Sequence, residues 1–148
     1  MNPIRHLLVG VDFDENSAQA LTYASDLAAH LGARITAVHA YSLPVLNALD
    51  AEYIPSATEA AHKADANQKH LDALLAAHKR DNVQMEGVLR IGAPAVEICA
   101  LARELGADLI IVGTHHRGVL GRALLGSVAE TVIREASVPV LTVRPPRS

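Results

Sequence analysis

The chain alternates short apolar runs, rich in β-branched residues, with segments whose apolar residues recur every three or four positions. Five runs have the length of strands, at residues 6–11, 34–41, 83–90, 108–113 and 138–144. The runs around Leu8 and Ile110 do not alternate with polar residues, as expected for strands buried on both faces of a parallel sheet. This alternation restricts the possible folds more than any other feature of the sequence, and it predicts strands separated by helices.

Four helices are expected between these strands. The first carries apolar residues from Ala18 to Leu31 and ends at Gly32. The third has Pro94 in its first turn and ends at Gly106. The second (residues 56–79) and the fourth (127–136) each open with a serine followed three residues later by a glutamate, which is the spacing of a capping box.

The order is therefore strand and helix in strict alternation, which predicts an open, five-stranded parallel sheet with right-handed crossovers and helices on both faces. Residues 42–55 form a long linker with a proline near each end. The sequence has no internal repeat and no break in composition, so residues 1–148 are expected to form a single domain.

Composition excludes several classes of protein. A net charge of -3 and an aromatic content of 3% argue against a nucleic-acid partner, which would normally meet a basic face or stacking rings. Cys99 is the only cysteine, which fits a reducing compartment. No apolar run has the length of a membrane span or a signal peptide. The expected location is the cytoplasm, with no membrane association.

The stretch between the fourth strand and the last helix carries most of the chemistry. Gly113 ends the strand, and the pair Gly126 and Ser127 opens the helix. Glycines let the backbone approach an anion, and free amides at a helix N-terminus donate to it. Arg117 and Arg122 add positive charge suited to phosphate. The alternative is that Ser127 is an N-cap, Gly126 a turn glycine and the arginines solvated.

From Leu7 to Arg144 the chain resembles the universal stress protein family. The ATP-binding members carry the pattern Gly-x2-Gly-x9-Gly-(Ser/Thr) in this loop, which Gly113, Gly126 and Ser127 match at the same spacing. His116 replaces the second glycine. Other family-like segments are Gly-Thr-His at 113–115, Leu-Leu-Gly-Ser-Val-Ala-Glu at 124–130, Val-Pro-Val-Leu at 138–141, Val-Asp at 11–12 and Gly-x-Pro at 92–94.

The resemblance implies a Rossmann-like, adenine nucleotide alpha-hydrolase-like sheet in the order 3-2-1-4-5. It also implies a homodimer formed through the last strand, residues 139–143, which begins with Pro139 and ends with Val143. The ligand implied is ATP, with any Mg²⁺ carried on its phosphates. Twelve residues would bind it: Gly10, Val11, Asp12, Ala40, Gly113, Thr114, His115, His116, Arg117, Gly126, Ser127 and Val128.

By the same resemblance, each part of the nucleotide has its own set of residues. Asp12 would hold the ribose region, with Gly113 against the ribose. The backbone around Ala40 would contact the adenine edge. The loop to Arg117, together with residues 126–128, would bind the phosphates. Because the loop 113–127 holds no aromatic residue, adenine is expected to lie on backbone and aliphatic side chains, with Tyr41 the only ring nearby.

Two departures from the family pattern leave alternatives open. The imidazole of His116 would either clash with a phosphate or donate a hydrogen bond to it. A glycine replaced in a left-handed conformation would also add strain of about 1–3 kcal/mol. Asp14 stands where the family often has serine. Its charge would repel a triphosphate, unless Asp14 instead caps the first helix, which is the favoured interpretation.

The leading hypothesis is a dimeric, adenine-nucleotide-binding regulatory or stress-response protein, with no catalytic residues and no protein-held metal. One alternative is a dimer of the same family that binds no nucleotide, with His116 as the mark of that loss. The other is a slow ATPase that uses Asp12, Asp14 or histidines. The histidines at 62, 70 and 78 have the spacing of a solvated helix face. His39 is interpreted as a packed, hydrogen-bonded residue and Cys99 as a buried one.

Overall fold

The structure is a computed structural model, and it describes residues 1–43, 55–114 and 125–145. Strands and helices alternate along the chain, as predicted. In chain order they are β1 (His6–Gly10), α1 (Glu15–Leu31), β2 (Arg34–Tyr41), α2 (Ala57–His78), β3 (Met85–Ile91), α3 (Pro94–Leu105), β4 (Leu109–Gly113), α4 (Ser127–Glu135) and β5 (Val140–Val143).

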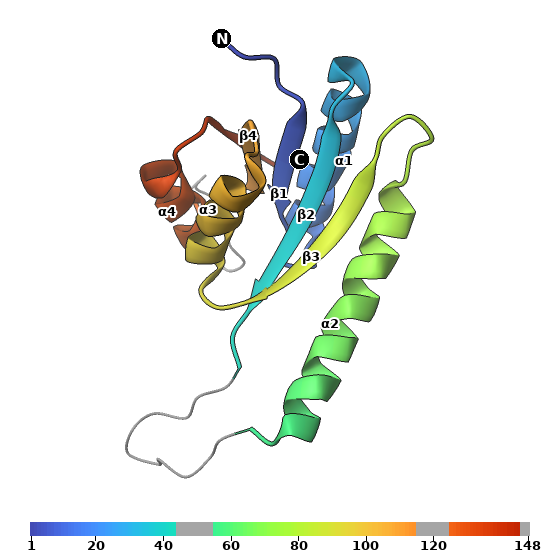
Figure 1. Ribbon diagram of the computed structural model, residues 1–148, viewed down its shortest axis with the longest axis vertical. Helices are drawn as coiled ribbons and strands as arrows, with labels where there is room; N and C mark the ends of the chain where they lie inside the picture. The colour runs from blue at the N-terminus through green and yellow to red at the C-terminus, as the bar shows by residue number, and fades with distance from the viewer. Residues whose placement is uncertain (44–54, 115–124, 146–148) are drawn as a thin grey trace.

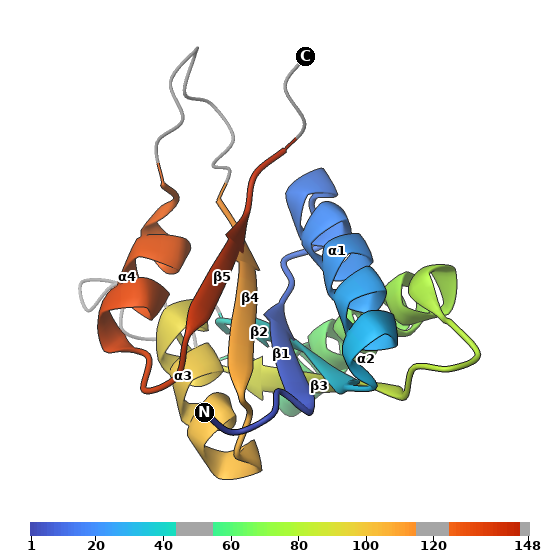
Figure 2. The same cartoon turned by 90° about the horizontal axis from the view of Figure 1, so that it is seen from above.

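The five strands form one sheet in the order β3-β2-β1-β4-β5, and every neighbouring pair is parallel. This confirms the predicted α/β fold, strand order and direction. Helices α1 and α2 lie on one face of the sheet, and α3 and α4 lie on the other (Figure 1, Figure 2). Connections leave β1 towards β2 and reach β4 from β3, so the order reverses between β1 and β4, at the centre of the sheet.

Two apolar clusters, one on each face, hold the helices to the sheet. The first joins α1 and Leu71 of α2 to alternate residues of the central strands, such as Leu7 and Ile111. The second joins α3 and α4 to the intervening residues, such as Leu8 and Ile110. These four strand residues are fully buried, because helices cover both faces of the central strands.

Helix ends follow the sequence signals at most positions. Asp14 caps α1 by accepting the Ser17 N–H at 2.8 Å, and Ser56 forms a complete capping box with Glu59 on α2. Pro94 is in the first turn of α3, and α1 and α3 end at glycines in the left-handed region. Helix α4 begins at Ser127, as expected, but the alternative that Ser127 is its N-cap is wrong. Gly126 is its N-cap and Ser127 is already helical, so Ser127 forms no capping box with Glu130.

Four strands are shorter than the apolar runs that predicted them, although the run 108–113 loses only its first residue, since β4 begins at Leu109. The run 83–90 begins as β3 only at Met85, because Val83 pairs with Arg80 in an isolated bridge. The run 138–144 is a strand only at Val140–Val143. The run 6–11 ends as β1 at Gly10. The greater part of the linker, residues 44–54, lies outside the described residues.

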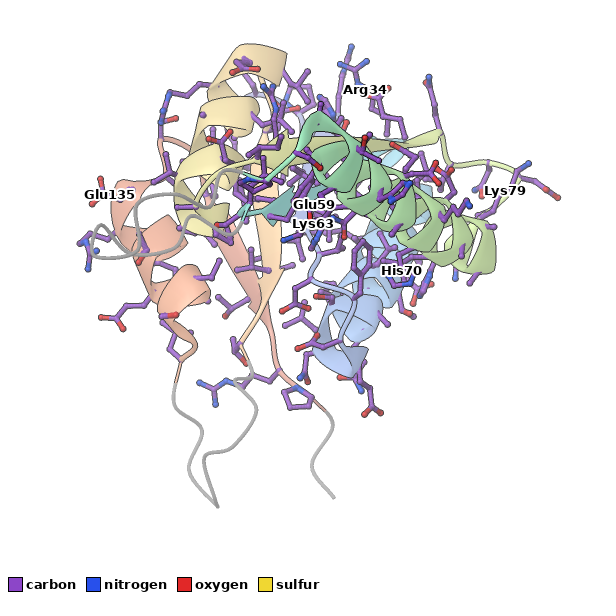
Figure 3. The ribbon with its side chains drawn as sticks, turned by 90° about the horizontal axis from the view of Figure 1, so that it is seen from below. Arg34, Glu59, Lys63, His70, Lys79 and Glu135 are labelled. Carbon is purple, nitrogen blue, oxygen red and sulfur yellow. The ribbon has the colours of Figure 1, made fainter. Side chains whose placement is uncertain are left out.

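Helix α2 is the most exposed of the four helices, since Leu71 is its only buried residue. Figure 3 shows the polar side chains that it carries, among them Lys63 and His70, with Lys79 at its end. His62 and His70 are exposed, as the spacing of the histidines predicted, whereas His78 is half-buried and hydrogen-bonded to Thr22 of α1. Across the parts of the chain that the structure describes, no helix is long and apolar enough to cross a bilayer.

Candidate functional site

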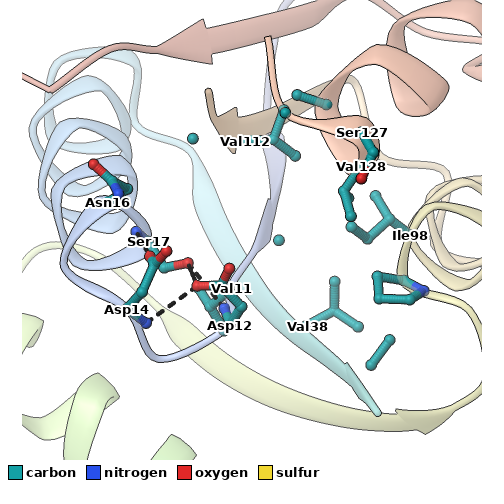
Figure 4. A pocket seen from close by; sticks show the side chains of 16 residues that line it. Val11, Asp12, Asp14, Asn16, Ser17, Val38, Ile98, Val112, Ser127 and Val128 are labelled. Carbon is teal, nitrogen blue, oxygen red and sulfur yellow. Dashed lines mark hydrogen bonds between the residues drawn. The ribbon is translucent and has the colours of Figure 1, made fainter. Parts of the chain in front are cut away.

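A cavity of about 240 Å³ lies beyond the carboxyl ends of β1, β2 and β4, where the strand order reverses. Open parallel sheets bind ligands at this place. Figure 4 shows the N-terminal part of α1 on one side of the cavity and α4 with α3 on the other. The residues that line it are Gly10, Val11, Asp12, Asp14, Asn16, Ser17, Val38, Ala40, Pro94, Ile98, Val112, Gly113, Gly126, Ser127, Val128 and Ala129.

The cavity brings together most of the predicted site residues that the structure describes. The lining includes Gly10, Val11, Asp12, Ala40, Gly113, Gly126, Ser127 and Val128. Thr114 is not among the lining residues. It is buried, its N–H donates to the Val143 carbonyl at 3.1 Å, and its own carbonyl accepts the Gly126 N–H at 2.9 Å. Thr114 therefore fixes the entry to α4. His115, His116 and Arg117 lie outside the described residues.

The floor and one wall of the cavity are aliphatic. Val38 and Val112 reach it from the sheet, and Ile98 and Val128 reach it from α3 and α4 (Figure 4). Tyr41, expected as the nearby ring, does not line the cavity but stacks with His39, at 6.1 Å between ring centroids. The described lining holds no aromatic side chain. A flat ligand would thus lie between aliphatic side chains and backbone.

One corner of the cavity is a hydrogen-bonded pair of carboxyl groups. Asp12 Oδ1 accepts the Ser17 hydroxyl at 2.5 Å and the Asp14 N–H at 3.1 Å. The Asp12 N–H in turn donates to Ser17 Oγ at 2.9 Å. Figure 4 shows the three side chains together at the start of α1. The serine therefore fixes both the backbone and the carboxyl of Asp12.

The two carboxyl groups have opposite pKa shifts. Desolvation, followed by the neighbouring Asp14 carboxyl, raises the pKa of Asp12 above its ordinary value. Burial alone would also raise the pKa of Asp14, but hydrogen bonds with Asp12, Ser17 and Asn16 outweigh it and lower that pKa. Two nearby carboxylates ionise less readily together than apart. Asp14 is therefore the anionic helix cap, and Asp12 is the more easily protonated group.

The N-terminus of α4 forms the opposite side of the cavity. Its N-cap is Gly126, which provides no side chain to accept from the first amides of the helix, at Ser127, Val128 and Ala129. All three of these residues line the cavity. Amides at this position carry the positive end of the helix dipole. They offer hydrogen-bond donors to an anion without any cationic side chain.

The third polar element is the backbone of Ala40. Carbonyls along a strand alternate in direction. The Val38 carbonyl points towards β1, where it accepts the Val11 N–H at 2.9 Å, and the Tyr41 carbonyl points towards β3, where it accepts the Gly92 N–H at 2.9 Å. The peptide groups of Ala40 therefore face the β1 side. Because β1 has ended at Gly10, they face the cavity that Ala40 lines.

The remaining candidates from the sequence lie outside the cavity. His39 is buried and its Nδ1 donates to the Val11 carbonyl at 2.8 Å, which confirms the packed, hydrogen-bonded histidine. Cys99 is 4% exposed, and burial raises the pKa of its thiol, as expected of an inert cysteine. Within the described residues, no three histidine, cysteine or acidic side chains are grouped to hold a metal ion.

Several lining residues were not predicted from the sequence. Ser17, Asn16 and Ala129 lie one turn or less from predicted residues, so helical periodicity would have found them. Val38 has the same strand parity as Ala40, and this would have placed it on the same side of the sheet. Ile98 had no such signal, because its place in the cavity depends on how α3 packs across β1.

The fold and the cavity define a Rossmann-like α/β protein with a cavity at the switch point of its sheet. The family model of the universal stress protein family matches residues 3–144. The chain belongs to that family.

Individual relatives are similar to this chain over nearly its full length. A universal stress protein of Methanocaldococcus jannaschii, MJ0531, is 30% identical over 146 residues, covering 99% of this chain and 85% of that protein. The solved structure of hypothetical protein MJ0577 superposes with a TM-score of 0.78 at 24% identity, covering 99% of this chain and all of that one. A universal stress protein solved in complex with cAMP has a TM-score of 0.65 at 27% identity, covering 96% and 98%.

Proposed function

We propose that this chain binds an adenine nucleotide, with ATP as the ligand, and acts as a dimeric regulatory or stress-response protein in the cytoplasm. The observation that carries the proposal is the N-terminus of α4, whose uncapped amides face Asp12 and Ala40 across an aliphatic cavity. The related universal stress protein that was solved with cAMP supports an adenine nucleotide as the class of ligand.

The three polar elements of the cavity suit the three parts of a nucleotide. Amides of Ser127 and Val128 would donate to phosphate oxygens, as helix N-termini do in other proteins. Asp12 would accept from the ribose hydroxyls. The Ala40 backbone offers one donor and one acceptor, the complement of the adenine edge. Valine and isoleucine side chains would hold the flat base in place of aromatic rings. Any Mg²⁺ would be carried on the phosphates.

Calorimetric titration with ATP and magnesium, together with mass spectrometry of material extracted from the purified protein, tests the proposal. We expect an adenine nucleotide in the extract or a measurable binding isotherm. If neither experiment detects an adenine nucleotide at millimolar concentration, the protein is instead a nucleotide-free dimer of the family. His116→Gly then measures directly whether the imidazole at the second glycine of the motif reduces or improves affinity.

A graded pair of substitutions tests the role of the α4 N-terminus. Gly126→Val would place a branched side chain beside the free amides and should weaken ATP binding at least about 100-fold, whereas Gly126→Ala should weaken it less. Gly126 has φ −62, which a side chain tolerates, so thermal stability should change little. Unchanged affinity in the valine variant would remove this helix end from the site.

We propose that the protein has no substantial catalytic activity of its own. A hydrolase would need a fixed base and a held metal, and Asp12 and Asp14 are engaged with each other and with Ser17. Steady-state measurement of phosphate release from ATP checks this. Hydrolysis above the buffer background that disappears in Asp12→Ala would establish a slow ATPase instead.

We propose that two copies pair along β5. The carbonyls of Pro139 and Val143 accept from β4, so the backbone groups of Val140 and Thr142 point to the open edge of the sheet. All four residues of β5 are half-buried, and the neighbouring Ile133 on α4 is 46% exposed. An apolar edge strand with free backbone groups is suited to pairing with a second strand.

Thr142→Pro tests this interface selectively. Proline removes an N–H at the open edge while the hydrogen bonds to β4, which involve residues 139, 141 and 143, keep their donors. Light scattering coupled to gel filtration should show a dimer for the wild-type protein and a monomer for the variant. A variant that stays dimeric would place the interface elsewhere.

A further inference from the structure

The regular pairing of β1 with β2 ends near Val11, whose carbonyl accepts a hydrogen bond from the His39 side chain. In the register of these strands, Gly10 lies opposite Val38, and the Val11 N–H still donates to the Val38 carbonyl at 2.9 Å. The next hydrogen bond of a parallel ladder would join the Ala40 N–H to the Val11 carbonyl. Among the described residues that bond is not formed, and the Val11 carbonyl instead accepts from His39 Nδ1 at 2.8 Å.

The identity of the donor is fixed by its acceptor. A carbonyl oxygen cannot donate, so the proton in this hydrogen bond is on Nδ1 of His39. The ring is buried, 9% exposed, and lies on the face opposite the cavity, where it packs between Phe13 and Tyr41. Its centroid is 4.2 Å from that of Phe13. The imidazole is therefore held in the one orientation that reaches the Val11 carbonyl.

The chain turns away from the sheet immediately after this hydrogen bond. Phe13 has a φ of 67°, a left-handed conformation that is uncommon for an aromatic residue. Its ring packs against His39 and, at 5.4 Å, against His70 of α2. This packing compensates the local strain and brings Asp12 to the edge of the cavity. His39 thus contacts both residues that flank Asp12 in sequence.

We propose that His39 is a positioning residue for base recognition: by holding the Val11 carbonyl towards its own ring, it keeps that carbonyl from the Ala40 N–H, which then faces the cavity. The inference rests on the proposed function and adds His39 as the residue that leaves the Ala40 amide free to bind the base. A strand residue without a donor at position 39 would let Val11 and Ala40 close the ladder. The Ala40 N–H would then donate to the Val11 carbonyl and no longer be free to donate to adenine.

The test compares His39→Val with His39→Asn. Valine suits a strand but has no donor, whereas the asparagine amide can donate to Val11 from a position close to that of Nδ1. In His39→Val, ATP affinity measured by calorimetry with magnesium should fall about ten-fold, the effect of one lost hydrogen bond with its unpaired partner. His39→Asn should recover most of this loss.

Inosine triphosphate distinguishes a lost base contact from a general structural defect, because a general defect would weaken the binding of both nucleotides. Its base presents a donor where adenine presents an acceptor, so it cannot use the Ala40 N–H in the same way. The affinity for inosine triphosphate should be the same in the wild-type protein and in His39→Val. Amide hydrogen exchange of Ala40, followed by nuclear magnetic resonance without ligand, should be slower in His39→Val because the ladder has closed.

His6→Val is the matched control, since His6 is also a buried, hydrogen-bonded histidine but lies at the other end of β1. It should leave the affinity for ATP unchanged. If wild-type protein binds ATP and His39→Val keeps both the affinity and the preference over inosine triphosphate, the role of His39 is wrong and the proposed function stands. If the wild-type protein binds no adenine nucleotide, the proposed function fails, and this role with it.

Discussion

The polar groups at the two ends of the parallel sheet differ in their surroundings: those at the amino end are paired with one another, and those at the carboxyl end face a cavity. At the amino ends of the strands, Arg34 donates to His6 Nδ1, His6 Nε2 donates to Thr36 Oγ1 at 2.7 Å, and Thr36 donates to Glu86 at 3.0 Å. The Asp108 carboxylate accepts the N–H of His6 at 2.9 Å. At this end the buried polar side chains of His6 and Thr36 are therefore hydrogen-bonded to other protein groups.

At the carboxyl ends, the backbone groups of Ala40 and the first amides of α4 face a cavity, and two carboxyl groups share one corner of it. Unpaired polar groups lower stability unless water or a ligand satisfies them. The amino end of the sheet thus pairs its buried polar groups with one another, whereas the carboxyl end presents polar groups to a cavity. Each of the following predictions tests that division.

The largest effect on stability is expected from Thr36→Val at the amino end. Thr36 is 0% exposed, and valine has a similar shape but leaves the His6 Nε2–H buried without an acceptor. We expect a loss of about 1–3 kcal/mol in the free energy of unfolding. Urea denaturation measures the loss, and calorimetry should show unchanged ATP binding. A change in affinity without a change in stability would contradict the division.

The pH dependence of stability should also originate at the amino end. Burial, followed by the Arg34 charge, lowers the pKa of His6 below its ordinary value of 6.5. The unfolded chain therefore binds a proton more readily than the folded one. The contribution of His6 is complete above the unfolded pKa and is lost as the pH falls towards the folded pKa, by at most about 1.4 kcal/mol per pH unit.

Urea denaturation at a series of pH values from neutral to mildly acidic checks this expectation. The slope below the ordinary histidine pKa should be smaller in His6→Gln, since glutamine can donate to Thr36 but does not titrate in this range. An identical slope in the two proteins would assign the dependence to another group.

A matched pair of glycine substitutions separates packing from binding. An added Cβ at Gly10 would lie 2.8 Å from Ile98 Cδ1, and one at Gly87 would lie 2.8 Å from methyl carbons of Leu71 and Leu75. In both cases the neighbours are side-chain rather than backbone atoms and must shift, so each alanine should cost about 1 kcal/mol. Only Gly10 lines the cavity, so only Gly10→Ala should weaken ATP binding. Equal affinities would contradict the assignment of the cavity.

The smallest stability effect is expected from Asp12→Asn. A carboxyl whose pKa is raised on folding opposes folding once the pH exceeds its unfolded pKa, so removing its charge should raise the melting temperature slightly at neutral pH. Asparagine keeps an oxygen that can accept from Ser17. ATP affinity should fall because the ribose loses a charged acceptor. A lower melting temperature would show that the Asp12 carboxylate stabilises the fold.

Much of the fold was predictable because its signals are local. Unbroken apolar runs such as the one at Ile110 identify buried parallel strands, and capping residues such as Asp14, Ser56 and Gly106 mark helix ends. Errors occurred at the ends of elements, where the type of a residue does not decide how it pairs. Val83 has the composition of a strand residue but pairs with Arg80 rather than with β2.

The predicted site depended on the resemblance to a family and on the rule that ligands bind beyond strand ends. Those two arguments name Asp12, Ala40 and Gly126, each of which lines the cavity. They do not find Ser17 or His39 as partners of the loop around Asp12. Side-chain hydrogen bonds of this kind depend on strand register and on the exact turn after β1, and neither is encoded by composition or periodicity.

The sequence by itself determined the alternation of strands and helices, the parallel sheet and the glycine-serine pair that opens the last helix, because each depends on residues close together in the chain. Only the tertiary structure decided which backbone groups remain unpaired. Whether the Ala40 amide faces β1 or a cavity depends on where β1 ends. In the structure the Val11 carbonyl accepts from the side chain of His39, which is 28 residues away in the chain, rather than from the Ala40 amide.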